Sequence, residues 1–437
     1  MIRTCFILCL AMLASGPARA AVQIQEVTSP GGVDAWLVEE NSIPFVALEI
    51  RFLGGASLDL PGKRGAINLM TGLIEEGAGD LDATAFAEAR DSLAASYEFS
   101  VFNDALSISA RFLTENRGEA VALLKSAITE PRFDQVAIDR VRGQVLSGIR
   151  SDLTDPNTIA SRAFSTMAYG DHPYASDQSG TADSVNGLVR DDIVTAHRNV
   201  LRRDNVYVGA SGNISADELA ALLDTLFSDL PMDGPEAPER AEITLDGGVT
   251  VVDFETPQSV AFFGHEGLSR DDPDFFPAFV ANEIFGGSGR LSRLGEEVRE
   301  KRGLTYGVGT YLVNYDDADM FLGQFASAND RVGEAIDVVR AEWAKIADAG
   351  VTEQELAEIK TYLTGAYPLR FDGNGPIARI MAGMQTLGLT PDYIETRNDR
   401  VNAVTQEDIQ RVAARIWAPE ALRFVVVGQP DGVDNVN

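Results

Sequence analysis

Cysteine, histidine and positive charge are scarce in this sequence. Its two cysteines, Cys5 and Cys9, lie close to the N-terminus, and only three histidines occur in 437 residues. If that N-terminal segment is removed, no thiol remains, which excludes a disulfide framework, a cysteine nucleophile and a cysteine-bound zinc site. The histidines, His172, His197 and His265, stand in separate segments and form no closely spaced pair. The sequence therefore lacks the ligand clusters from which zinc sites are usually built.

Basic residues are outnumbered by acidic ones. Lys and Arg number 36 against 66 Asp and Glu, which gives a formal net charge of −30 at pH 7. Such a surface repels nucleic acid and anionic membranes, so we expect no nucleic-acid partner. Outside the N-terminus no apolar run approaches the roughly 18 residues of a membrane helix, so no membrane span is expected. Hydrophobic residues make up 45% of the chain, which is too much for a disordered protein.

The N-terminal segment 1–20 has the layout of a secretory signal peptide. Arg3 precedes a short apolar run, and the small residues Ala18 and Ala20 stand where a signal peptidase would cut. A lipoprotein signal at Cys9 is a weaker alternative, because the residues before that cysteine are bulky. We therefore expect cleavage near Ala20 and a periplasmic or secreted product.

The sequence contains an internal repeat. Residues 183–193 align with 399–409 at an offset of 216, and residues 206–212 align with 422–428 at the same offset. Repetition in one register over such a distance indicates two related domains. We predict a signal peptide, two domains and a proline-rich linker with these bounds: 1–20 for the signal peptide, 21–230 for the N-terminal domain, 231–243 for the linker and 244–437 for the C-terminal domain.

Each copy mixes strands and helices. Residues 45–53 alternate between apolar and polar side chains, as in a half-buried strand, and 106–112 repeat that pattern. Apolar residues spaced three and four apart over 138–149 predict a helix. The fold class expected is α+β, with two homologous domains, each a mostly antiparallel sheet covered by helices on one face.

Two short segments carry the candidate chemistry. Residues 65–77, with the sequence GAINLMTGLIEEG, read as a buried helix that runs into a turn. Residues 286–306 begin with GGSG and continue as RLSRLGEEVREKRGLTY. Because glycine often follows a helix C-terminus and basic residues favour its last turn, we predict a helix over 290–302 that ends at Gly303. From Leu304 onward we predict a strand.

The repeated halves and these two segments together resemble the pitrilysin and insulinase family of zinc peptidases, the inverzincins, in its small two-domain form. Active members carry H-x-x-E-H on the first helix, with two zinc-binding His and a Glu base, and a further ligating Glu about 76 positions on. The resemblance places these four positions at Asn68, Thr71, Gly72 and Gly148. Since none of those side chains can replace the lost group, the resemblance implies a degenerate zinc site and no metal or other cofactor in this chain.

The second segment keeps its family pattern. The family motif V-R-E-K-x-G-L-x-Y is matched by residues 298–306. In the family this Arg and Tyr reach the substrate held at the zinc of a facing domain, so the resemblance implies catalytic roles for Arg299 and Tyr306. Three glycines ahead of the motif are expected to bind the substrate, because glycine lets one backbone approach another closely: Gly286, Gly287 and Gly289.

The glycine-rich segment fits no other catalytic motif. A phosphate-binding loop needs a following Lys-Ser/Thr, and G-x-S-x-G needs glycine where Arg290 stands. For His172 we predict a structural role in a loop, and for His265 a place at the end of a strand. Independent serine or aspartate chemistry has no supporting spacing.

Two functions remain after these exclusions. In the first, the chain is the non-zinc subunit of an exported heteromeric metallopeptidase, inactive alone, which supplies Arg299, Tyr306 and half of a peptide-binding chamber. A homologous subunit with H-x-x-E-H would be the partner and would hold the zinc. In the second, the chain is a non-catalytic scaffold or peptide-binding protein of the same fold.

Overall fold

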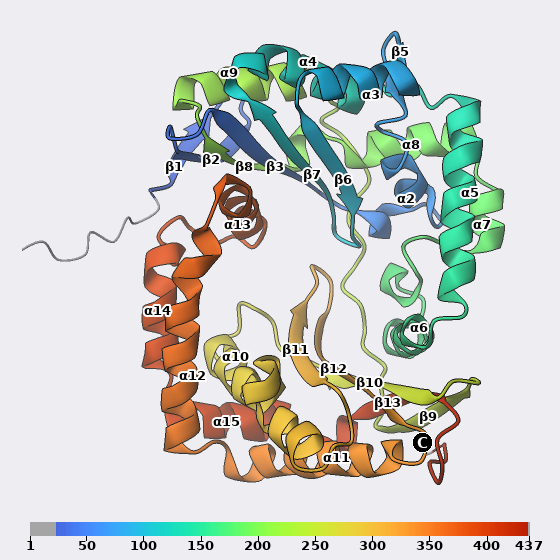
Figure 1. Ribbon diagram of the computed structural model, residues 1–437, viewed down its shortest axis with the longest axis vertical. Coiled ribbons are helices and arrows are strands. Elements are labelled where there is room, and N and C mark those ends of the chain that lie inside the picture. Colours follow the sequence, from blue (N-terminus) through green and yellow to red (C-terminus); the bar gives the residue numbers. More distant parts are fainter. Residues whose placement is uncertain (1–22, 436–437) are drawn as a thin grey trace, which may run out of the picture.

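The computed structural model describes residues 23–435, apart from the side chain of Arg290, and Figure 1 shows two sheet-and-helix halves. The signal peptide expected over 1–20 lies outside the described residues. None of the described helices is both long and apolar enough to cross a membrane.

The first half is built on a six-stranded sheet with the order β1-β2-β8-β3-β7-β6. All neighbours are antiparallel except β2 and β8. Along β3 the alternate side chains of Val46 and Phe52 are fully buried against helices, as the alternation predicts. The strands are β1 (Gln25–Thr28), β2 (Asp34–Glu39), β3 (Phe45–Leu53), β6 (Ser96–Val101), β7 (Ala105–Leu113) and β8 (Val206–Gly212), with a small ribbon of β4 (Gly77–Ala78) and β5 (Leu81–Asp82).

Helices of the first half cover one face of this sheet and extend along the side of the molecule towards the second half (Figure 1). The helices are α2 (Ala66–Thr71), α3 (Ala83–Ser92), α4 (Arg117–Thr129), α5 (Gln135–Asp152), α6 (Pro156–Tyr169), α7 (Ala182–Asn186), α8 (Arg190–Val200) and α9 (Ala216–Phe227).

The second half repeats this plan on a five-stranded sheet with the order β11-β12-β10-β13-β9. The repeated segments 206–212 and 422–428 form β8 and β13. Each lies between one parallel and one antiparallel neighbour. The prediction of an α+β fold with two mostly antiparallel sheets is confirmed. The strands are β9 (Gly248–Asp253), β10 (Gln258–Glu266), β11 (Val308–Asn314), β12 (Asp319–Ala328) and β13 (Arg423–Gly428), and the helices are α10 (Phe275–Asn282), α11 (Val332–Ala349), α12 (Glu353–Ala366), α13 (Asn374–Thr386), α14 (Tyr393–Ala403) and α15 (Gln406–Ile416).

Each half sends one helix onto the inner face of the other sheet. Helix α13 packs Ile377 and Met381 against Trp36, on the face of the first sheet opposite its own helices. A Cβ at Gly209 on β8 would collide with the carbonyl oxygen of Ala378, so glycine is needed for this close approach. The sequence pattern gave no sign of this helix, because its contacts lie far away in the chain.

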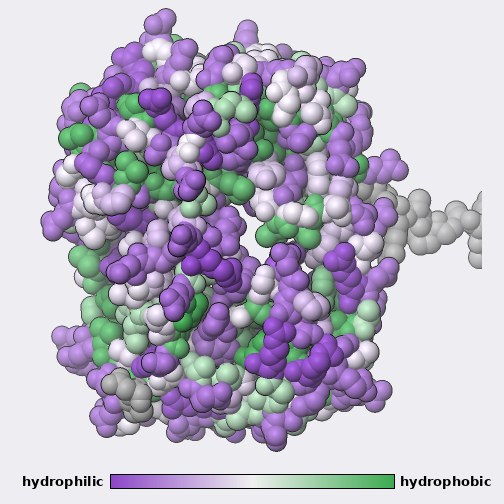
Figure 2. All heavy atoms as spheres, turned by 180° about the vertical axis from the view of Figure 1, so that it is seen from behind, coloured by the Kyte–Doolittle hydropathy of each residue, from purple (hydrophilic) through white to green (hydrophobic). Residues whose placement is uncertain are grey.

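Helix α6 makes the reciprocal contact on the second sheet. The ring of Phe164 meets that of Phe262 on β10 with centroids 5.0 Å apart, and Val425 on β13 belongs to the same cluster. The exchange of α6 and α13 ties the two halves together around a central space, and the face seen in Figure 2 is hollowed near its middle, between the halves. The inner faces of both sheets are thus partly covered by helices and partly left to that space.

Candidate functional site

The segment that carries Arg299 differs in detail from the predicted helix. A 3-10 turn covers Gly289–Leu291 and a π-helical stretch covers Gly295–Glu300, instead of one continuous helix over 290–302. The predicted end is confirmed, because Gly303 has a φ of +60° and its N–H donates to the carbonyl of Arg299 at 2.9 Å. π-Helical turns are rare and occur often at functional sites.

The prediction of a strand from Leu304 was wrong by four residues, since β11 begins at Val308. The Thr305 hydroxyl donates to the carbonyl of Ala326 at 2.7 Å and accepts the N–H of Gly307 at 3.1 Å. These side-chain hydrogen bonds hold a turn that delays entry into the sheet. Tyr306 lies in that turn and is therefore on the surface.

The two predicted catalytic residues lie together. The guanidinium carbon of Arg299 stands 5.0 Å from the centre of the Tyr306 ring, a cation–π contact. Arg299 also contacts its neighbour Glu300 at 3.5 Å. Tyr306 is 89% exposed, and its hydroxyl has no hydrogen-bond partner among residues 23–435. The arrangement presents a phenol that is free to donate to a ligand.

The predicted substrate-binding glycines line one pocket of about 350 Å³ next to this tyrosine. Gly307 and Gly309, which follow Tyr306, form another wall, and Asn157 from α6 reaches it from the first half. The pocket runs along β11, an edge strand of the second sheet. An edge strand has unpaired N–H and C=O groups that can hold an extended peptide. The residues of the glycine-rich segment on this wall are Gly286, Gly287 and Gly289.

The four degenerate zinc-motif positions lie on α2, at its end and on α5. Asn68 is half-buried, and the Thr71 hydroxyl donates to the carbonyl of Ile67 at 2.8 Å. A Cβ at Gly72 would lie 3.1 Å from Val141 on α5, whereas Gly148 faces open space. Within residues 23–435 no group of three or more His, Cys, Asp or Glu is placed to hold a metal ion. The residues present do not fit a zinc ion.

The three histidines contact the backbone. His197 is buried with Nε2 at 2.8 Å from the carbonyl of Ile128, and His172 contacts the carbonyl of Glu239 at 3.1 Å. His265 is the second-last residue of β10, as predicted, and its Nδ1 lies 2.7 Å from the carbonyl of Glu266. Burial lowers the pKa of His197 and of His265. These histidines hold the fold in place, as we predicted for His172 and His265.

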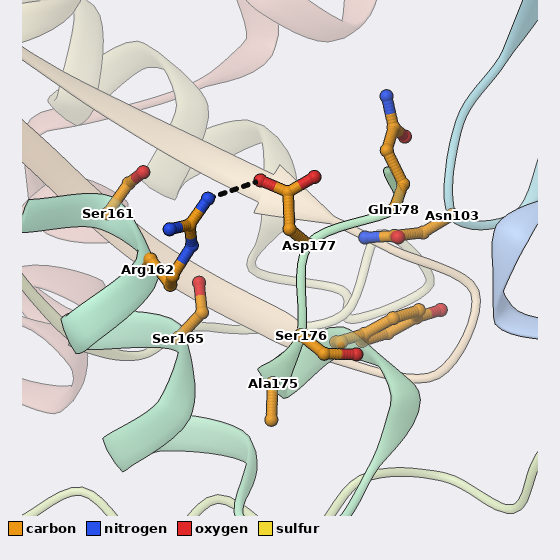
Figure 3. A pocket seen from close by; sticks show the side chains of 9 residues that line it. Asn103, Ser161, Arg162, Ser165, Ala175, Ser176, Asp177 and Gln178 are labelled. Atoms are coloured by element: carbon orange, nitrogen blue, oxygen red, sulfur yellow. Dashed lines mark hydrogen bonds and ion pairs between the residues drawn. The ribbon is translucent and has the colours of Figure 1, made fainter. Parts of the chain in front are cut away.

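A second, polar pocket of about 240 Å³ lies beside α6 (Figure 3). Arg162 and Asp177 face each other across it at 3.2 Å, and Ser161 and Ser165 line the wall on α6. Asn103, from the turn between β6 and β7, closes the opposite side. Because its two charged side chains satisfy each other, this pocket presents no uncompensated charge to a ligand.

Comparisons with known proteins show what this chain is similar to. Residues 187–363 match the family model described as the peptidase M16 inactive domain. An uncharacterised zinc protease of Streptomyces coelicolor is 25% identical over 398 residues, which cover 89% of this chain and 86% of that protein. A non-peptidase homolog of Helicobacter pylori is 25% identical over 395 residues, which cover 90% of this chain and 91% of that protein.

A solved structure shares the fold. The crystal structure of a peptidase M16 inactive domain from Pseudomonas fluorescens superposes with a TM-score of 0.88 at 24% identity, covering 95% of this chain and all of that one. The chain is thus similar to the peptidase M16 family, and these findings support a member of that family that lacks the active site.

Proposed function

We propose that this chain is the non-zinc subunit of an exported, heteromeric metallopeptidase. The observation that carries the proposal is the pairing of an exposed Tyr306 with Arg299 beside a glycine-lined pocket on a sheet edge. The first half, in contrast, has lost every zinc ligand. The partner would be a homologous subunit with H-x-x-E-H, which would hold the zinc and the base. The chain would act in the periplasm or outside the cell.

In this proposal the chain binds and orients the peptide. The N–H and C=O groups of the edge strand β11 would pair with an extended substrate, and the glycines at 286–289 and 307–309 would allow its backbone to approach. The Tyr306 hydroxyl would donate a hydrogen bond to the carbonyl oxygen of the scissile bond, where negative charge develops. The guanidinium of Arg299, stacked on the ring, would hold the phenol and the substrate backbone in place.

A second candidate is a non-catalytic scaffold or peptide-binding protein of the same fold. The relative named as a non-peptidase homolog favours this alternative. It uses the same pocket but needs no zinc-bearing partner. The two proposals differ in what Tyr306 does, since a scaffold gains nothing from a free phenol at this position.

The deciding experiment combines the chain with a zinc-bearing homologue from the same organism. Zinc content and peptide cleavage are measured for each chain alone and for the mixture. The peptidase proposal expects this chain alone to hold no zinc and cleave nothing, and expects the mixture to cleave far faster than the homologue alone. If the two chains do not associate, or if the homologue is fully active alone, the scaffold function is the correct one.

A further inference from the structure

A third cavity gathers positive charge in a strongly negative protein. It has a volume of about 440 Å³ and is lined by residues of α10, α13 and α14. Figure 1 shows where these three helices lie. No Asp or Glu of the described chain lines it, although acidic residues outnumber basic ones by 66 to 36. Four arginines line it: Arg270, Arg370, Arg379 and Arg397.

These arginines are poorly compensated. Among residues 23–435, no carboxylate lies within 4.0 Å of Arg270, Arg370 or Arg397. The nearest acid to Arg379 is Glu49, at that limit. Elsewhere in this chain most arginines have close carboxylate partners, as Arg293 has in Glu355 at 2.5 Å. Within residues 23–435 the cavity therefore holds arginines without a carboxylate in close ion-pair contact, and Glu283 acts on Arg370 and Arg397 only from beyond that distance.

Arg397 is the most enclosed of the four, with 7% of its surface exposed. Its Nη1 donates to the carbonyl of Leu363 at 3.0 Å and to Asn398 at 3.1 Å. Its Nε and Nη2 groups donate to no acceptor in the described part of the chain. Burial lowers the pKa of Arg397, as expected for a cation that water and acids compensate only in part. An arginine has five N–H donors, so several remain for a ligand.

Aromatic rings fix the orientation of the guanidinium groups. Arg397 lies over the rings of Tyr367 at 4.6 Å and Phe279 at 5.5 Å, and Arg270 lies over Phe275 at 5.0 Å. A guanidinium stacked on a ring keeps its N–H groups in the ring-parallel plane, where they suit the two oxygens of a carboxylate. The rest of the wall is apolar and includes Phe276, Ile380, Met384, Leu387 and Leu389.

One acid, Glu283, interacts through its charge with two of the cavity arginines. It follows α10 directly, and burial raises the pKa of its carboxyl, while the charges of Arg397 and Arg370 act against that rise. Its Oε1 lies on the side of the glycine-lined pocket, 2.8 Å from where a Cβ of Gly287 would stand. One continuous helical segment thus separates the arginine cavity from the pocket beside Tyr306. Gly286 follows Phe279 by seven positions, which is about 10 Å along a helix.

We propose that this arginine cavity binds a carboxylate carried on an apolar body, as at the C-terminal residue of a peptide with a large apolar side chain. The carboxylate would pair with the N–H edges of Arg270, Arg370 and Arg397, and the side chain would lie against the aromatic wall. The volume suits a ligand of a few amino-acid residues. This inference rests on the proposed function in one respect, namely that the carboxylate belongs to a peptide.

The test uses the mature chain alone, without zinc or a partner, so its outcome is independent of the peptidase test. Isothermal titration with N-acetyl-Ala-Ala-Phe is compared with the same peptide as its C-terminal amide. We expect the free acid to bind at least about tenfold more tightly, since charge-assisted hydrogen bonds are lost with the amide. A third titration with 3-phenylpropanoate tells a peptide from a small apolar acid as the source of the carboxylate. Equal affinity for this small acid would overturn the peptide as ligand.

Variants locate the site. Arg370→Gln and Arg270→Gln remove one donor group each and should weaken binding of the free acid about tenfold. Arg370 is exposed, so its change should leave the fold intact. Arg198→Gln, an exposed arginine on α8, is the control for the same change in charge and should bind as the parent does. Equal binding of acid and amide, or full binding by Arg370→Gln, would overturn the proposal.

Discussion

The guanidinium of Arg299 is stacked on the ring of Tyr306 at 5.0 Å, and the phenol is 89% exposed. The cation–π contact restricts the ring while the hydroxyl stays available. Two residues seven positions apart are thus brought together by the helix end at Gly303 and the turn at Thr305. The tyrosine is held in a defined place although its own side chain is hardly buried.

The first prediction concerns the hydroxyl of Tyr306. In a mixture with a zinc-bearing partner, Tyr306→Phe should lower kcat/KM for peptide cleavage by roughly 10²-fold, the loss typical of one oxyanion donor. The fall should lie in kcat, because the ring and its contact with Arg299 remain. Tyr362→Phe, which removes a hydroxyl from a half-exposed tyrosine on α12, serves as the control. Full activity of the Tyr306 variant would show that the motif has no catalytic role.

The second prediction fills the glycine-lined pocket. A Cβ at Gly307 meets nothing within 4 Å, so Gly307→Leu should project into the pocket without disturbing the fold. Peptide affinity should fall about tenfold or more, which corresponds to about 1.4 kcal/mol. Gly365→Leu on α12 also enters open space and should bind peptide as the parent does. Fluorescence anisotropy of a labelled extended peptide measures both, and unchanged affinity for the Gly307 variant would exclude this pocket.

The third prediction tests the exchanged helix α13. Gly209→Ala places a Cβ against the backbone of Ala378, so either α13 or β8 must shift. We expect the free energy of unfolding to drop by about 1–3 kcal/mol, as for other overpacked sites. Gly118→Ala adds the same methyl group to α4, where nothing lies within 4 Å, and should be neutral or slightly stabilising. Urea denaturation distinguishes the two, and equal stability would mean that α13 is loosely attached.

The fourth prediction concerns pH and the contact between the two hairpin tips. The N–H of Asp316, between β11 and β12, donates to Asp104, between β6 and β7, at 3.2 Å. Burial, followed by the charges of Asp104 and Asp317, raises the pKa of Asp316 from its usual 3.8 to about 6. Burial also raises the pKa of Asp104 and of Asp317 and lowers that of His172 nearby.

The direction in which the free energy of unfolding changes with pH follows from proton uptake. Between about pH 4 and pH 6 the folded Asp316 keeps a proton that the unfolded chain has released, so the free energy of unfolding should fall as the pH rises through this window. Asp316→Asn should reduce that dependence. It should not abolish it, because burial likewise raises the pKa of Asp59 to about 6. Urea midpoints from about pH 4 to about pH 7 give the measurement, and identical slopes in both proteins would refute the assignment.

The fifth prediction concerns metal removal. A ligand that binds only the folded state raises its stability, so stripping a structural metal lowers the unfolding temperature. Because the zinc-motif positions offer no ligating side chains, a chelator should leave the thermal midpoint of this chain unchanged. In the mixture with a zinc-bearing partner, the chelator should abolish cleavage. A lowered midpoint for the chain alone would reveal a metal site that the described residues do not suggest.

Predictions from the local sequence were accurate where short-range interactions determine the backbone conformation. The alternation over 45–53 matches β3, and glycine at 303 marks the helix end through its left-handed φ. The predicted helix over 290–302 was less accurate. Its backbone follows 3-10 and π-helical turns, and just ahead of them Gly286 lies so close to Thr310 on β11 that a Cβ would not fit. Such tertiary contacts leave no periodic mark in the sequence.

The repetition of two halves can be read directly from the sequence, and the loss of the zinc ligands from the residues at the positions that the family resemblance assigns. Both are read from residue identities, which need no knowledge of the fold. The exchange of α6 and α13 between the halves and the meeting of four arginines in one cavity are visible only in the three-dimensional fold. Arg270 and Arg397 are separated by more than a hundred residues. Their meeting follows from the docking of α10 against α14, which depends on packing across the whole second half.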